Sequence, residues 1–252
     1  MDFSGKVALI IGGASGMGFV FSKNFACLGG NVVMLDVNQK SLIEKADEIN
    51  ALNKGKAIAI TCDARNYKEI ANAKDKTIQE FGRIDIAISF AGGTARRIFN
   101  VDNSLEFPDV PIEVFDWGLD VNLKVPFYLA HAVLPQMRSQ KSGLIINIGS
   151  ISGAEGNASG LDYSTAKAGI MYGLTKSLAQ YGARHNIRCV CVSPGPVLTR
   201  PEMANMRTPL GRAAEPQEII DLILFIASEK GQFINGENIL IDGGRNAMGR
   251  SV

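Results

Sequence analysis

The sequence lacks the features of several special classes of protein. Among its 252 residues, no apolar run approaches the roughly 20 residues that a membrane-spanning helix needs. The first residues show no basic segment followed by an apolar run and a small-residue cleavage site, so we expect no secretory signal. Lys and Arg number 26, and Asp and Glu number 25. This balance gives no electrostatic reason to expect nucleic acid or an anionic membrane as a partner.

Cysteine and histidine are too few and too scattered to indicate a metal centre. Neither a zinc-site spacing nor a disulfide framework joins the four cysteines, Cys27, Cys62, Cys189 and Cys191. The two histidines, His131 and His185, fall in helical patterns away from other ligand-type residues. We therefore expect no bound metal, and buried free thiols in a reducing cytoplasm.

The sequence does contain a repeated alternation of short apolar runs and longer helical patterns. The runs cover residues 7–11, 32–35, 57–60, 84–88, 144–148, 188–192 and 238–241. The helical patterns cover about 16–28, 39–52, 67–81, 112–138 and 164–185. Runs that are apolar throughout predict strands buried on both faces, and intervening helices predict right-handed crossovers. The pattern predicts a single doubly wound (Rossmann-type) α/β domain over 1–252, with about seven parallel strands and helices on both faces.

One segment, 194–216, interrupts this alternation. It contains Pro196, Pro201 and Pro209 between Pro194 and Pro216, and it shows no clear helical or strand pattern. Because loops beside a site often close over a ligand, we expect this segment to form a substrate lid.

A glycine-rich turn, Gly12-Gly13-Ala14-Ser15-Gly16-Met17-Gly18, follows the first predicted strand. Glycines in this pattern permit a tight turn, close approach to a pyrophosphate and close packing of the following helix. The helix N-terminus offers free N–H groups and the positive end of its dipole to an anion. Such turns are common, but the strand before it and the helix after it favour a dinucleotide site. We expect cofactor contacts from Gly12, Ser15, Gly16, Met17 and Gly18.

Asp36 ends the second predicted strand, about 20 residues after the turn. Its carboxylate can accept hydrogen bonds from the adenosine ribose of NAD and would repel the 2′-phosphate of NADP. Ser15 and Val37, the neighbours best placed to offer a cation, carry none. We therefore expect NAD as the cofactor. The alternative interpretation of Asp36 is an acid that caps the next helix.

A tyrosine, a lysine and a serine form a second motif. Tyr163 and Lys167 are four residues apart on a predicted helix and share one face, and Ser150 lies 13 positions before Tyr163 at a strand end. A nearby ammonium lowers the pKa of a tyrosine from about 10, which would make Tyr163 a usable base. The Ser150 hydroxyl can stabilise charge on a substrate oxygen. The alternatives are an exposed helix face and a capping serine.

These motifs, together with Asn122 and Pro194-Gly195, resemble the short-chain dehydrogenase/reductase family over essentially the whole chain. The resemblance implies an oxidoreductase that interconverts a secondary alcohol and a ketone by hydride transfer. It implies Ser150, Tyr163, Lys167 and Asn122 as catalytic residues, with Asn122 holding a water that links Lys167 to solvent. The alternative for Asn122 is a solvent-facing side chain.

The resemblance also implies further contacts with NAD. Asp63 would contact the adenine, the backbone at Ala91 and Gly92 would pass the adenosine ribose, and Val197 and Thr199 would fix the carboxamide. Besides the glycine-rich turn, the implied cofactor residues are Asp36, Asp63, Ala64, Ala91, Gly92, Tyr163, Lys167, Pro194, Gly195, Val197 and Thr199. The chain departs from the family pattern at Ile11, Ser89 and Phe90, where we expect altered packing and no loss of catalysis.

The substrate is less constrained by the sequence. Ligands of open α/β sheets lie beyond the carboxyl ends of the strands, so segments 93–99, 152–161 and 194–208 should line the pocket. They offer Thr94, Arg96, Ser152 and Asn157 as candidate substrate contacts, and Arg96 or Arg97 could pair with a carboxylate. The alternative for both arginines is solvation of a loop. No wide aromatic cluster suited to a steroid occurs, so we favour a polyol, a sugar or a sugar acid.

Two other functions remain open. A 3-oxoacyl-carrier-protein reductase would use NADPH, against which Asp36 argues. A catalytically silent nicotinamide-binding sensor or scaffold would not need Ser150, Tyr163 and Lys167, which are all present. By resemblance, the chain would assemble as a homotetramer through the helices at 112–138 and 164–185 and through its last strand. We expect a small-molecule substrate and further copies of this chain as its partners.

Overall fold

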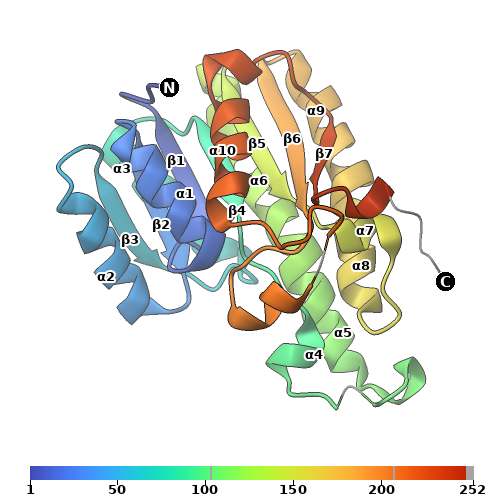
Figure 1. The fold of residues 1–252 in the computed structure, drawn as a ribbon. Coiled ribbons are helices and arrows are strands. Elements are labelled where there is room, and N and C mark those ends of the chain that lie inside the picture. Colours follow the sequence, from blue (N-terminus) through green and yellow to red (C-terminus); the bar gives the residue numbers. More distant parts are fainter. Residues whose placement is uncertain (103, 207, 248–252) are drawn as a thin grey trace.

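The computed structural model describes residues 1–102, 104–206 and 208–247, and in these ranges seven parallel strands form one sheet (Figure 1). The strand order is β3-β2-β1-β4-β5-β6-β7. Their bounds are β1 Val7–Ile11, β2 Asn31–Asp36, β3 Ala57–Thr61, β4 Ile86–Ser89, β5 Gly143–Ile148, β6 Ile187–Pro194 and β7 Asn238–Ile241. The winding direction reverses between β1 and β4, and the crevice at such a point is where open α/β sheets bind ligands. The predicted doubly wound fold is confirmed.

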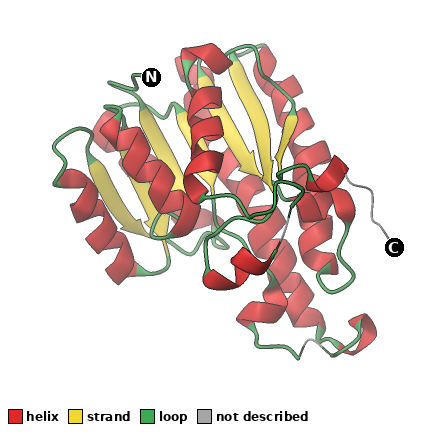
Figure 2. Ribbon diagram, in the orientation of Figure 1, coloured by secondary structure: helices red, strands yellow, loops and turns green. Residues whose placement is uncertain are grey.

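Helices cover both faces of the sheet (Figure 2). One face packs against α1 (Gly16–Cys27), α2 (Gln39–Asn50) and α10 (Pro216–Ala227). The other packs against α3 (Tyr67–Phe81), α6 (Val125–Gln140) and α9 (Thr175–Ala183). Neighbouring residues of β1 face opposite layers, with Ile10 in the first and Leu9 in the second, and both are fully buried. This two-sided burial explains why the strands are apolar throughout.

Two long helices approach the carboxyl edge of the sheet, and each contains a π-helical turn. α5 (Ile112–Leu119) continues into α6 through a π-helical turn at Asp120–Lys124. α8 (Leu161–Ala168) continues into α9 through another at Gly169–Leu174. Both helices were predicted, but their π turns, which often accompany functional sites, were not. Within the described ranges, no helix has the length and apolar character to cross a membrane.

The pattern missed three helices: α10, the short α4 (Ala95–Ile98) and α7 (Ile151–Glu155). The start of α10 does carry a local signal, since Pro216 occupies its first turn and Glu215 forms a capping box with Glu218. Because the segment 194–216 is rich in proline, Pro216 was assigned to that segment and the helix that begins there was not predicted.

The predictions for the cysteines and for the packing beside β4 are confirmed only in part. Cys62, Cys189 and Cys191 are buried free thiols as predicted, but Cys27 is exposed at the end of α1. At the departures from the family pattern, Phe90 packs against Phe21 with ring centroids 5.8 Å apart. The Ser89 hydroxyl is buried and has no hydrogen-bond partner among the described residues. The packing beside β4 is thus filled by aromatic contact.

Arg188 joins the start of β6 to the far end of α10. Its guanidinium donates hydrogen bonds to the carbonyl oxygens of Ile226, Gly231 and Ile234, at 2.9, 3.1 and 2.8 Å. Burial lowers the pKa of Arg188, because desolvation disfavours its charged form. The side chain therefore supplies charged donors to three carbonyls at this junction, of which the Gly231 carbonyl also accepts a hydrogen bond from the Ile234 amide.

We predict that Arg188→Met lowers the free energy of unfolding by about 2–4 kcal/mol, because half-buried carbonyls lose charged donors. Urea denaturation would measure the change. Lys68→Met, which removes an exposed cation from α3, is the matched control and should change stability by less than about 0.5 kcal/mol. Equal effects of the two substitutions would contradict the role given to Arg188.

Candidate active site

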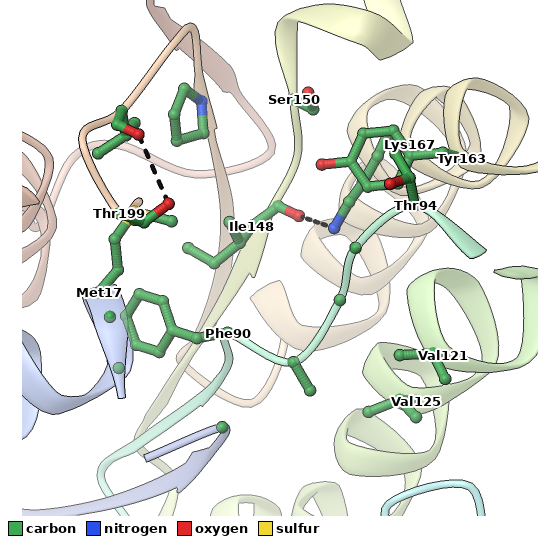
Figure 3. Close-up of a pocket in the computed structure, with 18 of the residues that line it drawn as sticks. Met17, Phe90, Thr94, Val121, Val125, Ile148, Ser150, Tyr163, Lys167 and Thr199 are labelled. Atoms are coloured by element: carbon green, nitrogen blue, oxygen red, sulfur yellow. Dashed lines mark hydrogen bonds between the residues drawn. The ribbon is translucent and has the colours of Figure 1, made fainter. Parts of the chain in front are cut away.

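The carboxyl ends of β1, β4, β5 and β6 border a cavity of about 860 Å³ (Figure 3). It extends from the glycine-rich turn and the ends of β2 and β3 to α4, α5 and the segment after β6. The sequence-predicted residues that line it are Gly12, Ser15, Gly16, Met17, Gly18, Asp36, Asp63, Ala64, Ala91, Gly92, Thr94, Ser150, Ser152, Asn157, Tyr163, Lys167, Pro194, Gly195, Val197 and Thr199. Asn122 and Arg96 lie outside this lining.

The glycine-rich turn, called the glycine cradle below, packs so closely against backbone that side chains on Gly12 and Gly18 would clash. A Cβ atom on Gly12 would lie 2.8 Å from the Ala91 nitrogen, and one on Gly18 would lie 2.0 Å from the Gly12 oxygen. Gly12 also has φ +79°, a conformation that favours glycine. Ser15 precedes α1, and its side chain forms no capping hydrogen bond. The N-terminal amides of α1 and this hydroxyl are thus placed to bind a phosphate group.

Asp36 and Asp63 line the cavity beyond the ends of β2 and β3. The Asp36 carboxylate accepts hydrogen bonds from the amides of Ala14 (3.2 Å) and Asn38 (3.0 Å), which fix its orientation and leave acceptor capacity on both oxygens. Asp63 forms an ion pair with Arg65, with 2.7 Å between Oδ2 and Nη2. Hydrogen bonds from Arg65 hold the pKa of Asp63 below its ordinary value.

Ser150, Tyr163 and Lys167 converge at the opposite side of the cavity (Figure 3). Ser150 caps α7, and its Oγ accepts a hydrogen bond from the Ser152 amide at 3.2 Å. Tyr163 and Lys167 lie one turn apart on α8, and Lys167 Nζ is 5.5 Å from the centre of the Tyr163 ring. The buried Lys167 ammonium donates to the Ile148 carbonyl at the end of β5, at 2.8 Å. The position of this cluster is therefore fixed by the end of strand β5, which precedes Ser150, and by helix α8, which carries Tyr163 and Lys167.

The electrostatic state of this cluster differs from the sequence-based expectation. Desolvation raises the pKa of Tyr163, and the influences that oppose it are a hydrogen bond with Ser150 and the positive charge of Arg200. Burial lowers the pKa of Lys167 to about 8. The predicted lowering of the Tyr163 pKa by Lys167 does not appear in this geometry. Lys167 is instead a buried amine that can exchange a proton near neutral pH.

Asn122 is fully buried in the π-helical turn, which contradicts the solvent-facing alternative. Its Nδ2 donates to the carbonyls of Gly93 (2.9 Å) and Gly118 (2.8 Å), and its Oδ1 accepts from the Gly93 amide at 3.0 Å. A Cβ atom on Gly92 would lie 2.7 Å from Asn122 Oδ1 and 3.5 Å from Lys167 Nζ. Asn122 thus holds the loop after β4 against the lysine, and the water role implied by the resemblance remains a proposal.

The two neighbouring arginines of α4 have different surroundings. Arg96 is buried, and its guanidinium donates to the carbonyl oxygens of Asp102 and Leu105 at 3.1–3.3 Å. It braces the following loop, so the prediction that Arg96 contacts substrate is wrong. The neighbouring Arg97 lines the cavity.

Two lining residues at this end were not predicted from the sequence, Trp117 from α5 and Val121 from the π-helical turn. Arg200, Met203 and Met206 lie in the segment 194–208, which was predicted to line the pocket, although they were not named individually. Trp117 is the one tryptophan of the chain and lies four positions before Val121, so the two share a helix face. This pair could have been used to predict that the face lines a ligand site. The segment predicted to form a lid contains a short 3-10 helix at Pro201–Asn205, and its residue 207 lies outside the described residues.

In the described part of the chain, no group of three or more His, Cys, Asp or Glu side chains is arranged to hold a metal ion. The hydroxyl of Ser150, the phenol of Tyr163 and the amine of Lys167 can position a substrate oxygen and transfer its proton.

Comparison with known proteins places this arrangement among dehydrogenases. A family model described as short chain dehydrogenase matches residues 6–209. The chain is 34% identical to a 3-oxoacyl-[acyl-carrier-protein] reductase of Thermotoga maritima, over 97% of this chain and 99% of that protein. It is 36% identical to a trans-4-hydroxycyclohexanecarboxylate dehydrogenase of Sinomonas cyclohexanicum, over 96% and 93%.

A solved structure of 7α-hydroxysteroid dehydrogenase complexed with NADH and 7-oxo glycochenodeoxycholic acid superposes with a TM-score of 0.86. The sequence identity is 28%, over 97% of this chain and 95% of that chain. The same fold therefore carries a nicotinamide dinucleotide in that protein.

We predict that Lys167→Met is more stable than the wild type at pH 7, by on the order of 1–3 kcal/mol. The pKa of Lys167 is lowered from 10.5 to about 8, so below pH 8 folding buries a charged amine. The penalty disappears as pH rises to about 10.5, where the unfolded chain also loses the proton. Loss of the hydrogen bond to Ile148 offsets part of the gain.

Urea denaturation at pH 7 and about pH 9.5, followed by Trp117 fluorescence, tests this dependence. The advantage of Lys167→Met should shrink at the higher pH. Lys176→Met removes an exposed ammonium from α9 and serves as the control. A difference independent of pH would contradict the desolvation of Lys167.

Proposed function

The chain belongs to the short-chain dehydrogenase family, and on that premise we propose that it interconverts a secondary alcohol and a ketone on a polyol, sugar or sugar acid, using NAD. As a family member it is an oxidoreductase that acts on hydroxyl or keto groups with a nicotinamide cofactor. The observation that carries the proposal is one cavity that joins Ser150, Tyr163 and Lys167 to the glycine cradle and Asp36.

The residues present fit a nicotinamide dinucleotide. Gly12 and Gly18 allow the turn to pack closely against the loop after β4 and against itself, and the N-terminus of α1 lines the cavity without a side-chain cap from Ser15. Asp36 and Asp63 would hold the adenosine part, and Val197 and Thr199 the carboxamide. When bound, the cofactor accepts the hydride that leaves the carbinol carbon.

Asp36 supports NAD as the cofactor. A 2′-phosphate on the adenosine ribose would meet a carboxylate that two backbone amides already fix in place. Arg65, the nearest lining cation at this end, is bound through its guanidinium to Asp63. Like-charge repulsion therefore opposes NADP and leaves NAD favoured.

Tyr163 is the proposed general acid and base. In oxidation, its phenolate takes the hydroxyl proton while the carbon–oxygen bond becomes a carbonyl; in reduction, the phenol returns the proton. Ser150 would hold the substrate oxygen by a hydrogen bond. Lys167, with its pKa near 8, would pass the proton onward, and Asn122 would complete the path to solvent through a water.

The polar lining at Thr94, Ser152 and Asn157 supports a hydroxylated substrate. The relationship to a 3-oxoacyl-[acyl-carrier-protein] reductase favours that activity as the second candidate, but Asp36 argues against its usual NADPH. The relationship to a dehydrogenase of a cyclic hydroxy acid favours a small carboxylated alcohol. The silent sensor or scaffold is disfavoured because the catalytic cluster is complete.

We further propose a homotetramer in the cytoplasm. Phe127 on α6 and Tyr172 in the π-helical turn after α8 expose about half of their surface, at 54% and 50%. Phe233, before β7, is fully exposed. These apolar side chains lie on the two long helices and near the last strand, where a second copy would cover them. The free cysteines suit a reducing compartment.

We predict that Tyr163→Phe lowers kcat by about 100-fold or more, because the hydroxyl proton loses its acceptor. Calorimetric binding of NAD should stay nearly unchanged, since the phenyl ring remains. Tyr67→Phe removes a phenol on α3, outside the cavity, and is the matched control. Substantial turnover by the Tyr163 variant would rule out the proposed role.

For the cofactor, Asp36→Ala should raise the ratio of kcat/KM with NADP to kcat/KM with NAD by about 10-fold or more, through loss of ribose hydrogen bonds and of repulsion. Asp47→Ala removes an exposed carboxylate from α2 without touching the cavity. An unchanged ratio in the Asp36 variant would show that the ribose lies elsewhere.

A further inference from the structure

The lining carboxylates lie at one end of the cavity and three of its four lining cations at the other, whereas the fourth cation, Arg65, is paired with Asp63. The carboxylates, Asp36 and Asp63, lie at the ends of β2 and β3, on the adenosine side. Arg97, Arg200 and Lys167 line it from α4, the lid and α8. Among the residues that line the cavity, no carboxylate accompanies these three cations. The catalytic end thus presents a positive field to an entering ligand.

Arg97 lies over the loop that touches the catalytic lysine. A Cβ atom on Gly93 would lie 3.4 Å from Arg97 Nη2, and Gly92, the residue before it, borders Lys167 Nζ. In the described part of the chain, the Arg97 guanidinium has no ion pair or hydrogen bond, whereas the Arg96 guanidinium is occupied by carbonyls. Arg97 is therefore an available cation beside the reacting centre.

Arg200 approaches the same centre from the lid. Its charge acts on the Tyr163 phenol, which it helps toward the ionised form. Its partner Glu202 is 3.8 Å away and 77% exposed, an arrangement that contributes little in water. Both arginines can therefore turn to a ligand at small cost.

The walls beside these cations include apolar side chains as well as the polar Thr94, Ser152 and Asn157. Trp117 and Val121 line one side, and Met203 and Met206 line the lid side. Arginine is a donor without acceptor capacity, so the pair suits an acceptor-only group better than the mixed donors and acceptors of a neutral polyol. A carboxylate on a partly apolar carbon skeleton satisfies both features.

We propose that Arg97 and Arg200 form a carboxylate subsite, so that the substrate is the anion of a hydroxy acid or of the matching oxo acid. This inference rests on the proposed function and narrows its substrate class. The carboxylate would bind the guanidinium groups, and the carbon skeleton would pack on Trp117 and the lid methionines. The hydroxyl would then reach Ser150 and Tyr163 from a carbon remote from the acid group.

The test measures NADH formation with a neutral polyol, sorbitol, and with three hydroxy acids, 4-hydroxycyclohexanecarboxylate, 3-hydroxybutyrate and gluconate, each beside its neutral carboxamide. The wild type should prefer at least one acid over its amide by about 10-fold or more in kcat/KM. Arg97→Gln should lower kcat/KM for that acid by about 10- to 100-fold, chiefly through KM, and should nearly abolish the preference over the amide. Arg97→Lys should restore part of it.

Calorimetry of NAD binding distinguishes a carboxylate subsite from a cofactor contact, since the Arg97 variant should keep the wild-type affinity. Lys68→Gln removes one exposed charge from α3 and should alter neither acid nor amide turnover. Equal wild-type turnover of acids and amides would overturn the subsite while the proposed function stands. An equal loss for acid and amide in Arg97→Gln, or weakened NAD binding, would overturn it as well. Failure of every acid, amide and neutral polyol to reduce NAD would overturn the proposed function and the subsite together.

Discussion

The site depends on a single buried contact, between the Lys167 ammonium and the Ile148 carbonyl. A buried amine is tolerated only where an acceptor meets it, and the end of β5 supplies one. Gly92 lets the loop after β4 approach the same nitrogen, and Asn122 holds that loop from the π-helical turn. Strand, helix and loop are thus fixed around a group whose pKa, at about 8, lies in the working range of a proton carrier.

The sequence predicted what depends on local pattern. Strands buried on both faces are continuous apolar runs, and the glycine-rich turn and the Tyr163–Lys167 spacing are local as well. Contacts set by tertiary structure could not be predicted in the same way. Arg96 and Arg97 are neighbours on a four-residue helix, and only the fold decides that one braces a loop and the other lines the cavity. The positive charge of Arg200 favours the ionised form of Tyr163. Arg200 lies in a proline-rich segment without helical or strand periodicity, so its position near Tyr163 could not be predicted from a sequence pattern.

The two ends of the cavity differ in charge, and this difference orients both proposed ligands. Carboxylates after β2 and β3 suit the hydroxyls of an adenosine ribose, whereas the arginines of α4 and the lid suit an anionic substrate. Phosphate groups would lie between them, on the N-terminus of α1. The relatives include a 3-oxoacyl-[acyl-carrier-protein] reductase, a hydroxysteroid dehydrogenase and a dehydrogenase of a cyclic hydroxy acid, so the family indicates the class of reaction and leaves the substrate open.

The central claim is oxidation of a small hydroxylated compound with NAD. The most direct measurement mixes the purified protein with NAD or NADP and a panel of polyols, sugars, sugar acids and 3-hydroxyacyl thioesters, and follows the absorbance of the reduced nicotinamide. Turnover of a polyol, sugar or sugar acid with NAD is the predicted result. Turnover confined to thioesters with NADP would contradict both the cofactor and the substrate assigned to this site.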